Sequence, residues 1–92
     1  MGVGFGFAIA AQALNPKKKI VMVVGDSAFG FSGMEVETAL RYNLPLKIII
    51  INNNGIGRGY EELEKEDTGQ SIPVNALTVK ANYHLISHAF GG

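Results

Sequence analysis

"IVMVVGDSAFGFSGMEVETALRYNLPLKIIIINNN", residues 20–54, contains two apolar runs separated by a stretch of helical character. The runs at 20–24 and 46–51 are rich in β-branched side chains and end at glycine or asparagine, which predicts two strands covered on both faces. Between them, residues 33–42 have a helical pattern, and Ser32 with Glu35 predicts a capping box at its start. Strand, helix and strand in this length predict a βαβ unit with parallel strands and a right-handed crossover.

The flanking segments extend this α/β pattern. Residues 3–14 combine small and aromatic side chains with almost no polar face, which predicts a helix buried on most sides. Residues 55–73 are glycine-rich and then acidic, which predicts a mobile loop or a short exposed helix. Asn82 is expected to cap a last helix that runs through Phe90 and stops at the two terminal glycines. We therefore predict an α/β chain with a partial doubly wound parallel sheet and flanking helices.

Length and composition narrow the classes of protein. A chain of 92 residues is one domain at most, or a piece of one, and buries only ~60–65% of the surface that it exposes when unfolded. Its 8 basic and 8 acidic side chains give a formal net charge of +0, which argues against a nucleic-acid or anionic membrane partner. Without cysteine, disulfides and thiolate metal sites are excluded. The apolar start lacks the basic region of a secretory signal and is too short to span a bilayer.

Polar residues follow both predicted strands. Asp26 follows the first strand, and three asparagines at 52–54 and Gly55 follow the second. The C-terminal ends of parallel strands share one edge of the sheet, where such folds bind ligands, so we expect these groups to converge.

Carboxylate, amide and carbonyl oxygens suit Mg²⁺, with phosphate and water in its remaining positions. Backbone N–H groups of residues 27–30, before a helix near Ser32, are placed to meet the phosphate charge. Two blander interpretations stay open, a turn capped by Asp26 and a merely polar asparagine loop.

"GDS" followed by "NN" resembles the cofactor motif of thiamine diphosphate-dependent enzymes, and the interval from Asp26 to Asn53 agrees with that motif. "GDSAFGFSGMEVET", "RYNLP" and "NNNGI", with "MGVGFGFAIAA" and "HAFGG", resemble the branch of 2-hydroxyacyl-CoA lyase and oxalyl-CoA decarboxylase. The resemblance covers nearly the whole chain. It implies that residues 1–92 are part of the domain that binds the diphosphate and Mg²⁺, and that the partner domain for the pyrimidine ring is absent.

The resemblance also implies roles for individual residues, with no catalytic side chain among them. Mg²⁺ would be held by the side chains of Asp26 and Asn53 and by the main-chain carbonyl of Gly55. The residues that would contact thiamine diphosphate are Met1, Gly25, Ser27, Ala28 and Ile56. Met1 matches a methionine that packs under the cofactor, and the other four match residues that line the diphosphate.

The activity implied by the resemblance is that of a carbon–carbon lyase. Such an enzyme would cleave a 2-hydroxyacyl-CoA to formyl-CoA and an aldehyde, or decarboxylate oxalyl-CoA, as a cytoplasmic or peroxisomal homodimer or homotetramer. The glutamate that protonates the cofactor belongs to the absent domain, so we expect the isolated chain to be inactive. Gly57 stands where relatives commonly have tyrosine, which motivates an alternative: a non-catalytic, truncated or divergent remnant that retains the fold or an oligomer interface.

Other residues are given no role in the site. Arg58 could meet a CoA phosphate but is interpreted as a solvated loop residue. His84 and His88 have the spacing of a two-histidine metal face, yet lack a third ligand, so they are predicted to lie on the helix surface. The glycines of "GVGFGF" follow no strand and lack the spacing of a dinucleotide-binding loop.

Overall fold

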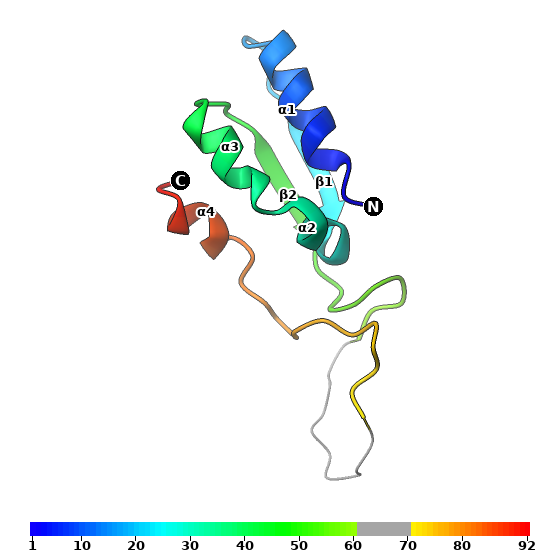
Figure 1. Cartoon of the computed structure of the whole chain (residues 1–92). Coiled ribbons are helices and arrows are strands. Elements are labelled where there is room, and N and C mark those ends of the chain that lie inside the picture. Colours follow the sequence, from blue (N-terminus) through cyan, green and yellow to red (C-terminus); the bar gives the residue numbers. More distant parts are fainter. Residues whose placement is uncertain (61–70) are drawn as a thin grey trace.

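The computed structural model of the chain describes residues 1–60 and 71–92. The elements in these ranges are, in chain order, α1 (Gly4–Leu14), β1 (Val21–Gly25), α2 (Asp26–Ser32), α3 (Glu35–Arg41), β2 (Lys47–Ile51) and α4 (Leu85–Ala89), shown in Figure 1. The loop or helix expected at 55–73 falls largely on residues 61–70, which lie outside the described residues.

The predicted βαβ unit is confirmed. β1 and β2 pair in parallel, with Val21 opposite Lys47 and Gly25 opposite Ile51. The crossover consists of α2 and α3, and Figure 1 shows both helices on the same side of the two strands as α1. The register brings the last residues of β1 and β2 side by side, so the segments that follow both strands leave the sheet at one edge.

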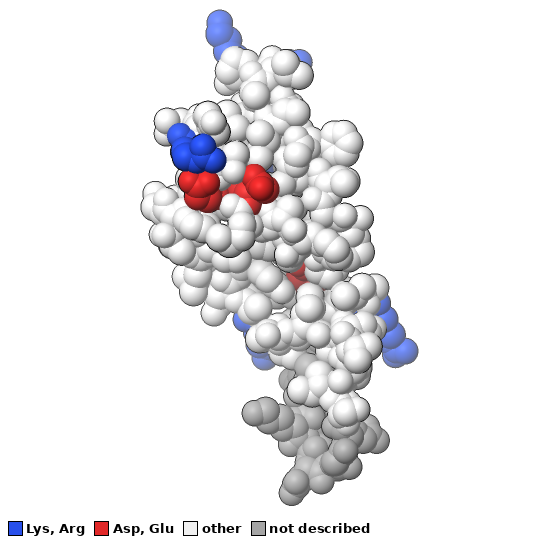
Figure 2. Space-filling view, in the orientation of Figure 1, with Lys and Arg blue, Asp and Glu red and all other residues white. Residues whose placement is uncertain are grey.

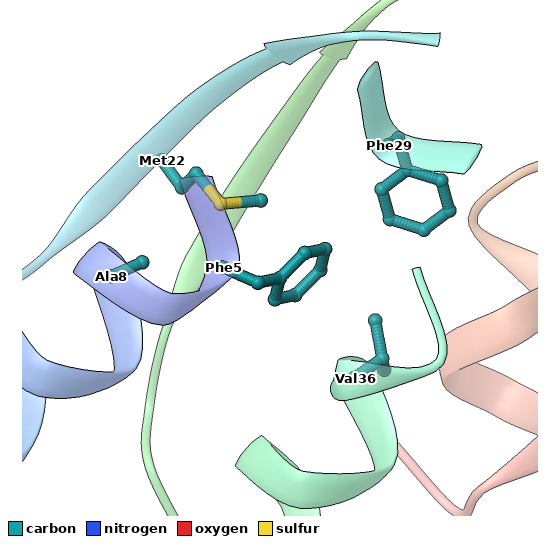
Figure 3. Close-up of a cluster of buried hydrophobic side chains, with 5 residues drawn as sticks. All are labelled: Phe5, Ala8, Met22, Phe29 and Val36. Carbon is teal, nitrogen blue, oxygen red and sulfur yellow. The ribbon is translucent and has the colours of Figure 1, made fainter. Parts of the chain in front are cut away.

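The core lies between the helices and one face of the sheet. Five buried side chains from α1, β1, α2 and α3 form it, drawn in Figure 3: Phe5, Ala8, Met22, Phe29 and Val36. The ring centroid of Phe29 lies 5.7 Å from that of Phe5 and 5.6 Å from that of Tyr83. Phe29 thereby joins α1, α2 and the segment that leads into α4 through aromatic contacts of favourable tilted and edge geometry.

The second face of the sheet is exposed. Along the strands, Val21 and Val23 of β1 are 54% and 63% exposed, and Ile49 and Ile51 of β2 are 49% and 58% exposed. Met22, between the two valines, is buried. The expectation that both faces are covered is therefore wrong for the described part of the chain. A continuous apolar run indicates that a strand can be buried on both faces. Whether both faces are covered depends on other segments of the protein.

Helix α1 occupies nearly the predicted range but is buried on one side only. Phe5, Ala8 and Gln12 are its buried residues, at the spacing of a single helical stripe. Phe7 and Leu14 are exposed on the other sides. The prediction of a helix buried on most sides is thus wrong within the described residues, because one sheet face and one neighbouring helix can cover only one stripe of α1.

The crossover differs from the predicted single helix over 33–42. A first helix, α2, already begins at Asp26, directly after β1, and ends at Ser32. The Ser32 hydroxyl donates to the Gly2 carbonyl oxygen at 2.8 Å, and α3 has Met34 as its N-cap with no side-chain cap bond. The predicted capping box of Ser32 and Glu35 is therefore wrong, because the serine still belongs to the preceding helix and binds the N-terminal segment.

The end of the chain is a short helix closed by glycine. Asn82 does not cap it: α4 has His84 as its N-cap, with no side-chain cap bond, and Asn82 contributes only its carbonyl oxygen, to the Leu85 N–H at 3.0 Å. The predicted glycine stop is confirmed. Gly91 has φ +85°, and the N–H groups of Gly91 and Gly92 donate to carbonyls of the last turn in the pattern of a Schellman motif.

Charged side chains are sparse on the face shown in Figure 2. Acidic and basic groups meet there over α3, where Arg41 and Glu37 form an ion pair at 3.0 Å, one helical turn apart. Within residues 1–60 and 71–92, none of the helices is both long enough and apolar enough to cross a membrane.

Candidate cofactor and metal site

The segments that follow β1 and β2 meet at the edge of the sheet. Asp26 is the first residue of α2, and its Oδ2 accepts a hydrogen bond from the Gly55 N–H at 3.2 Å. The pairing of Gly25 with Ile51 explains this contact, since it starts both segments from adjacent positions. The structure therefore brings together two of the three predicted metal ligands across 29 positions of sequence.

The Asp26 carboxylate is buried without a cationic partner among the described residues. Its side chain is 2% exposed, and its Oδ1 accepts from the Ser27 N–H at 2.8 Å. The one ion pair in residues 1–60 and 71–92 joins Arg41 and Glu37, away from this carboxylate. A buried carboxylate without a counter-charge is energetically unfavourable, and each of its oxygens can accept further bonds beyond the amide that it already has. The arrangement fits a bound cation.

The three asparagines after β2 make different contacts. Asn52 Oδ1 accepts from the Asn54 N–H at 3.0 Å, which closes a local turn. Asn54 has both ends of its side-chain amide bonded to backbone groups. Asn53 Nδ2 donates to the Gly57 carbonyl at 3.1 Å, whereas no described residue donates a hydrogen bond to Asn53 Oδ1. Among the described residues, the amide oxygens of Asn52 and Asn54 each accept one hydrogen bond, whereas that of Asn53 accepts none.

Gly55 presents its backbone to Asp26. It forms an isolated antiparallel bridge with Ala76, and two backbone hydrogen bonds of 2.8 Å join the residues that flank this pair. In such a pair, the N–H and C=O of the central residue point away from the opposite strand. The Gly55 N–H reaches Asp26, and the carbonyl of the same extended residue faces the same way. This bridge pattern predicts the main-chain oxygen of Gly55 on the side of the carboxylate.

Close packing explains why residue 55 is glycine. A Cβ atom there would lie 2.8 Å from Cδ2 of Tyr60 and 3.1 Å from the carbonyl oxygens of Arg58 and Asn75. Two of these three neighbours are backbone atoms, which cannot move without the loop itself changing. The absence of a side chain is therefore required for residue 55 to fit between Tyr60, Arg58 and Asn75.

The residues predicted to meet the diphosphate lie mostly at the start of α2. Gly25 is the N-cap, and Ser27 and Ala28 are in the first turn, where backbone N–H groups lack helical partners. The expectation that the "SAFG" amides precede a helix starting near Ser32 is wrong, because α2 starts at Asp26 and includes them. One of these N–H groups, from Ser27, already binds Asp26.

Met1 and Ile56 lie at the margins of the site. Ile56 follows Gly55 directly and is exposed. Met1 is 65% exposed, and the neighbouring Gly2 is bonded to Ser32, at the opposite end of α2 from Asp26. A helix of seven residues is about 10 Å long, so the structure does not bring Met1 into the group around Asp26.

Tyr83 is a neighbour of the site that the sequence did not indicate. Burial raises the pKa of its phenol, and the nearby charge of Asp26 raises this pKa further. Its ring packs edge-on against Phe29. The apolar spacing of residues 83, 86 and 90 was a signal that this ring faces the core, but its proximity to Asp26 depends on the packing of α4 against the rest of the chain.

A hollow of about 510 Å³ lies between β2, α3 and the α4 segment. It is lined mainly by apolar side chains and reaches the predicted site only at Asn52. His84 and His88 border it with ring centroids 6.3 Å apart, and both are exposed, as predicted. No cluster of three or more His, Cys, Asp or Glu side chains occurs in the part of the chain that the structure describes. The candidate metal site uses a different donor set, with one acid and two amide-type oxygens.

Comparison with known proteins agrees with the resemblance seen in the sequence. The family model described as "Thiamine pyrophosphate enzyme, C-terminal TPP binding domain" matches residues 1–92. The chain is 47% identical to 2-hydroxyacyl-CoA lyase 1 of Homo sapiens over 102 residues, which cover 100% of this chain and 18% of the relative. It is 46% identical to oxalyl-CoA decarboxylase of Escherichia coli K12 over 92 residues, covering 100% of this chain and 16% of that relative.

The extent of these matches decides what they show. The chain spans 17% of the length of 2-hydroxyacyl-CoA lyase 1 from Dictyostelium discoideum, to which it is 44% identical, so the similarity concerns a small part of the longer proteins. The family model covers the βαβ unit, the asparagine loop and α4 of this chain together. The chain therefore belongs to the family described as "Thiamine pyrophosphate enzyme, C-terminal TPP binding domain".

Proposed function

We propose that this chain is the diphosphate- and Mg²⁺-binding segment of a thiamine diphosphate-dependent carbon–carbon lyase. The observation that carries the proposal is the buried carboxylate of Asp26, which has no cationic side chain beside it in the described residues and faces the Gly55 backbone. A divalent cation at this point would balance the carboxylate charge and attract the diphosphate of the cofactor.

In this proposal the ligands of Mg²⁺ are Asp26, Asn53 through Oδ1, and the carbonyl oxygen of Gly55. These are hard oxygen donors, and Mg²⁺ commonly completes such a set with phosphate oxygens and water. Gly25, Ser27, Ala28 and Ile56 would line the diphosphate, with the first turn of α2 supplying N–H groups. When bound, thiamine diphosphate supplies the electron-accepting ring that allows a carbon–carbon bond beside a carbonyl to break.

The parent reaction is proposed from the similarity to these relatives and from the resemblance seen in the sequence. It is the cleavage of a 2-hydroxyacyl-CoA to formyl-CoA and an aldehyde, or the decarboxylation of oxalyl-CoA, with an acyl-CoA as substrate in either case. We further propose a homodimeric or homotetrameric parent, in the cytoplasm or in peroxisomes. The residues of the site bind and orient the cofactor, and none of them is placed to transfer a proton to its ring, so the chain by itself is proposed to be inactive.

A second candidate is a remnant without catalysis that retains the fold or an oligomer interface. The observation that favours it is Gly57, at φ +72° and directly bonded to Asn53 through its carbonyl oxygen. The loop uses a left-handed backbone conformation where relatives are expected to place an aromatic side chain. Turnover of oxalyl-CoA or a 2-hydroxyacyl-CoA by the chain in the presence of Mg²⁺ and thiamine diphosphate would eliminate this candidate.

Isothermal titration calorimetry tests the leading proposal. The wild-type chain should release or absorb heat with thiamine diphosphate when Mg²⁺ is present, and the signal should vanish when the metal is chelated. Asp26→Asn should abolish this heat. Glu35→Gln is the matched control, since Glu35 is an exposed acid whose carboxylate is bonded to Thr38 on α3, and it should bind as the wild type does. A folded wild-type chain that gives no Mg²⁺-dependent heat would contradict the proposal.

A further inference from the structure

Asn54 joins three segments of the chain beside the candidate metal site. Its Nδ2 donates to the Tyr60 carbonyl oxygen at 2.7 Å, and its Oδ1 accepts from the Lys80 N–H at 2.9 Å. Its own carbonyl oxygen accepts from the Leu77 N–H at 2.8 Å. Tyr60 precedes residues 61–70 in the sequence, whereas Leu77 and Lys80 follow them. One side chain and its backbone therefore tie together the two stretches that flank this range.

The backbone of Asn54 has an uncommon conformation. Its φ is +62°, in the left-handed region that glycine and asparagine adopt more readily than other residues. Asn54 lies between Asn53 and Gly55, the two ligands contributed by this loop. The path of the backbone from Asn53 to Gly55, the two proposed ligands, thus depends on a residue type that tolerates this φ.

The side chain of Asn54 is not arranged as a ligand. Both ends of its amide are engaged by backbone groups of Tyr60 and Lys80. The side chain of Asn53 differs, because of its two polar atoms only Nδ2 is bonded within the described residues. A metal at Asp26 would find the Asn53 oxygen available, while Asn54 would stay in its bonds to the loop.

The placement of Gly55 depends on the contacts of Asn54. The bond from the Leu77 N–H to the Asn54 carbonyl is one of the two that flank the bridge between Gly55 and Ala76. This bridge turns the Gly55 N–H toward Asp26, where it is bonded at 3.2 Å. Loosening Asn54 would therefore loosen the approach of Gly55 to the carboxylate.

We propose that Asn54 is a positioning residue of the metal site: without touching the ion, it holds Gly55, and with it the loop that carries Asn53, against Asp26. The inference rests on the proposed function for its consequence in metal binding. Its structural part, the placement of the Gly55 amide against Asp26, can be measured on the chain without any ligand.

The first measurement is amide hydrogen exchange at Gly55, followed by NMR on the full 92-residue chain without ligand. Asn54→Gly keeps the left-handed backbone accessible and removes both side-chain bonds, so Gly55 should exchange about 5- to 30-fold faster. Asn54→Asp retains the acceptor for Lys80 and loses the donor to Tyr60, so its exchange rate should fall between those of the wild type and Asn54→Gly. This variant replaces Asn54→Gly in the comparison if the glycine variant folds poorly. Asn82→Gly is the matched control, because Asn82 is exposed and its side chain bonds no described residue.

The second measurement is the Mg²⁺ titration at a fixed concentration of thiamine diphosphate, read from the Gly55 amide signal of the folded chain. A smaller population of the binding-ready loop lowers the apparent affinity in proportion, so Asn54→Gly should require about 5- to 30-fold more Mg²⁺. At saturating Mg²⁺ the signal should return to its wild-type position. A residue of purely structural importance would lower the unfolding temperature and leave the titration midpoint of the folded chain unchanged.

Two results would overturn the role of Asn54. One is an unchanged exchange rate at Gly55 in Asn54→Gly. The other is an equal acceleration at Gly55 and in the core around Met22, which would indicate general loss of stability. A wild-type chain that does not bind thiamine diphosphate would refute the proposed function instead, while the exchange comparison would still decide whether Asn54 positions Gly55.

Discussion

At the scale of single residues, Gly55 and Asp26 show how much of the site depends on close approach. The carboxylate is almost wholly buried, and its second oxygen is bonded to the N–H of Gly55, which Tyr60 and the carbonyls of Arg58 and Asn75 surround too closely for a side chain. The chemistry of the edge therefore needs two residue types at once. An acid must follow one strand, and a glycine must allow the loop after the other strand to pack closely.

Replacing Gly55 with alanine should destabilise the chain by about 1–3 kcal/mol, because the added methyl group would overlap Tyr60 and two carbonyl oxygens. Gly30→Ala is the matched control. A Cβ at Gly30 has no atom within 4 Å, and alanine in the interior of α2 should stabilise by about 0.5–1 kcal/mol. Urea unfolding of both variants would measure the difference, and equal effects would show that the packing around Gly55 is looser than described.

The phenol of Tyr83 leads to a prediction about pH. Its pKa is raised in the folded chain, by burial first and by Asp26 second, so folding favours the neutral form. Below a pH of about 10, the phenol is protonated in both the folded and the unfolded chain, and its contribution to stability is complete. Above that pH the unfolded chain loses the proton first, so the free energy of unfolding should fall as pH rises.

Tyr83→Phe should make this decline shallower above about pH 10, measured by urea unfolding at several pH values. Tyr42→Phe is the control, since the Tyr42 ring is exposed and lies under Arg41 at the end of α3. It should leave the slope as in the wild type. The same slope in all three proteins would show that Tyr83 does not contribute to the alkaline loss of stability.

At the scale of elements, the crossover is held by contacts between distant parts of the chain. α2 starts directly at the end of β1, and its last residue, Ser32, is bonded to Gly2 ahead of α1. α3 begins after a separate turn, without a side-chain cap. The position of α2, and with it the orientation of Asp26, therefore depends on the N-terminal segment as well as on the strand that precedes it.

Ser32→Ala should reduce stability by about 0.5–1.5 kcal/mol through loss of the bond to Gly2. If Ser32 acts as described, amide exchange should accelerate in residues 1–7 and remain unchanged in α3. Faster exchange at the start of α3 would instead indicate the capping role that the sequence suggests. Ser71→Ala, at an exposed position, should change neither region.

The sequence was informative wherever local pattern decides the structure. The β-branched runs predicted both strands, their spacing predicted the parallel crossover, and Gly91 predicted the end of α4. It was misleading at Ser32, since a serine three residues before a glutamate suits a cap equally well when it belongs to another helix. The pattern also gave no sign that Asn54 differs from its neighbours, because its partners come from residues much further along the chain.

At the scale of the whole molecule, the sheet is covered on one side. Val23 and Ile49 stand near the centre of the other face, 63% and 49% exposed, among further valine and isoleucine side chains. An exposed apolar face of this kind favours contact with another surface. The chain spans 17% of one relative and 18% of another, so both relatives contain many residues with no counterpart in it.

We expect the isolated chain to bind a hydrophobic dye and to associate as its concentration rises. Val23→Thr with Ile49→Thr keeps β-branched side chains while adding hydroxyls, so it should weaken both effects and preserve the strands. Sedimentation velocity over a range of concentrations, with dye fluorescence, measures them. Met22→Thr is the contrasting variant, since Met22 is buried in the core and its loss should unfold the chain. Unchanged association in the double variant would place the contact elsewhere.

The bonds that join Asn54 and Tyr60 to residues 75–80 have a practical consequence for engineering. They hold the residues on both sides of positions 61–70 in place. Residues added between these positions should therefore not pull on the ends of the strands. In general, doubling the length of a flexible loop costs only ~0.6 kcal/mol in chain entropy. We expect a peptide tag inserted between these positions to cost a similar amount. A reporter inserted between these positions should be mechanically separated from the candidate metal site by those bonds.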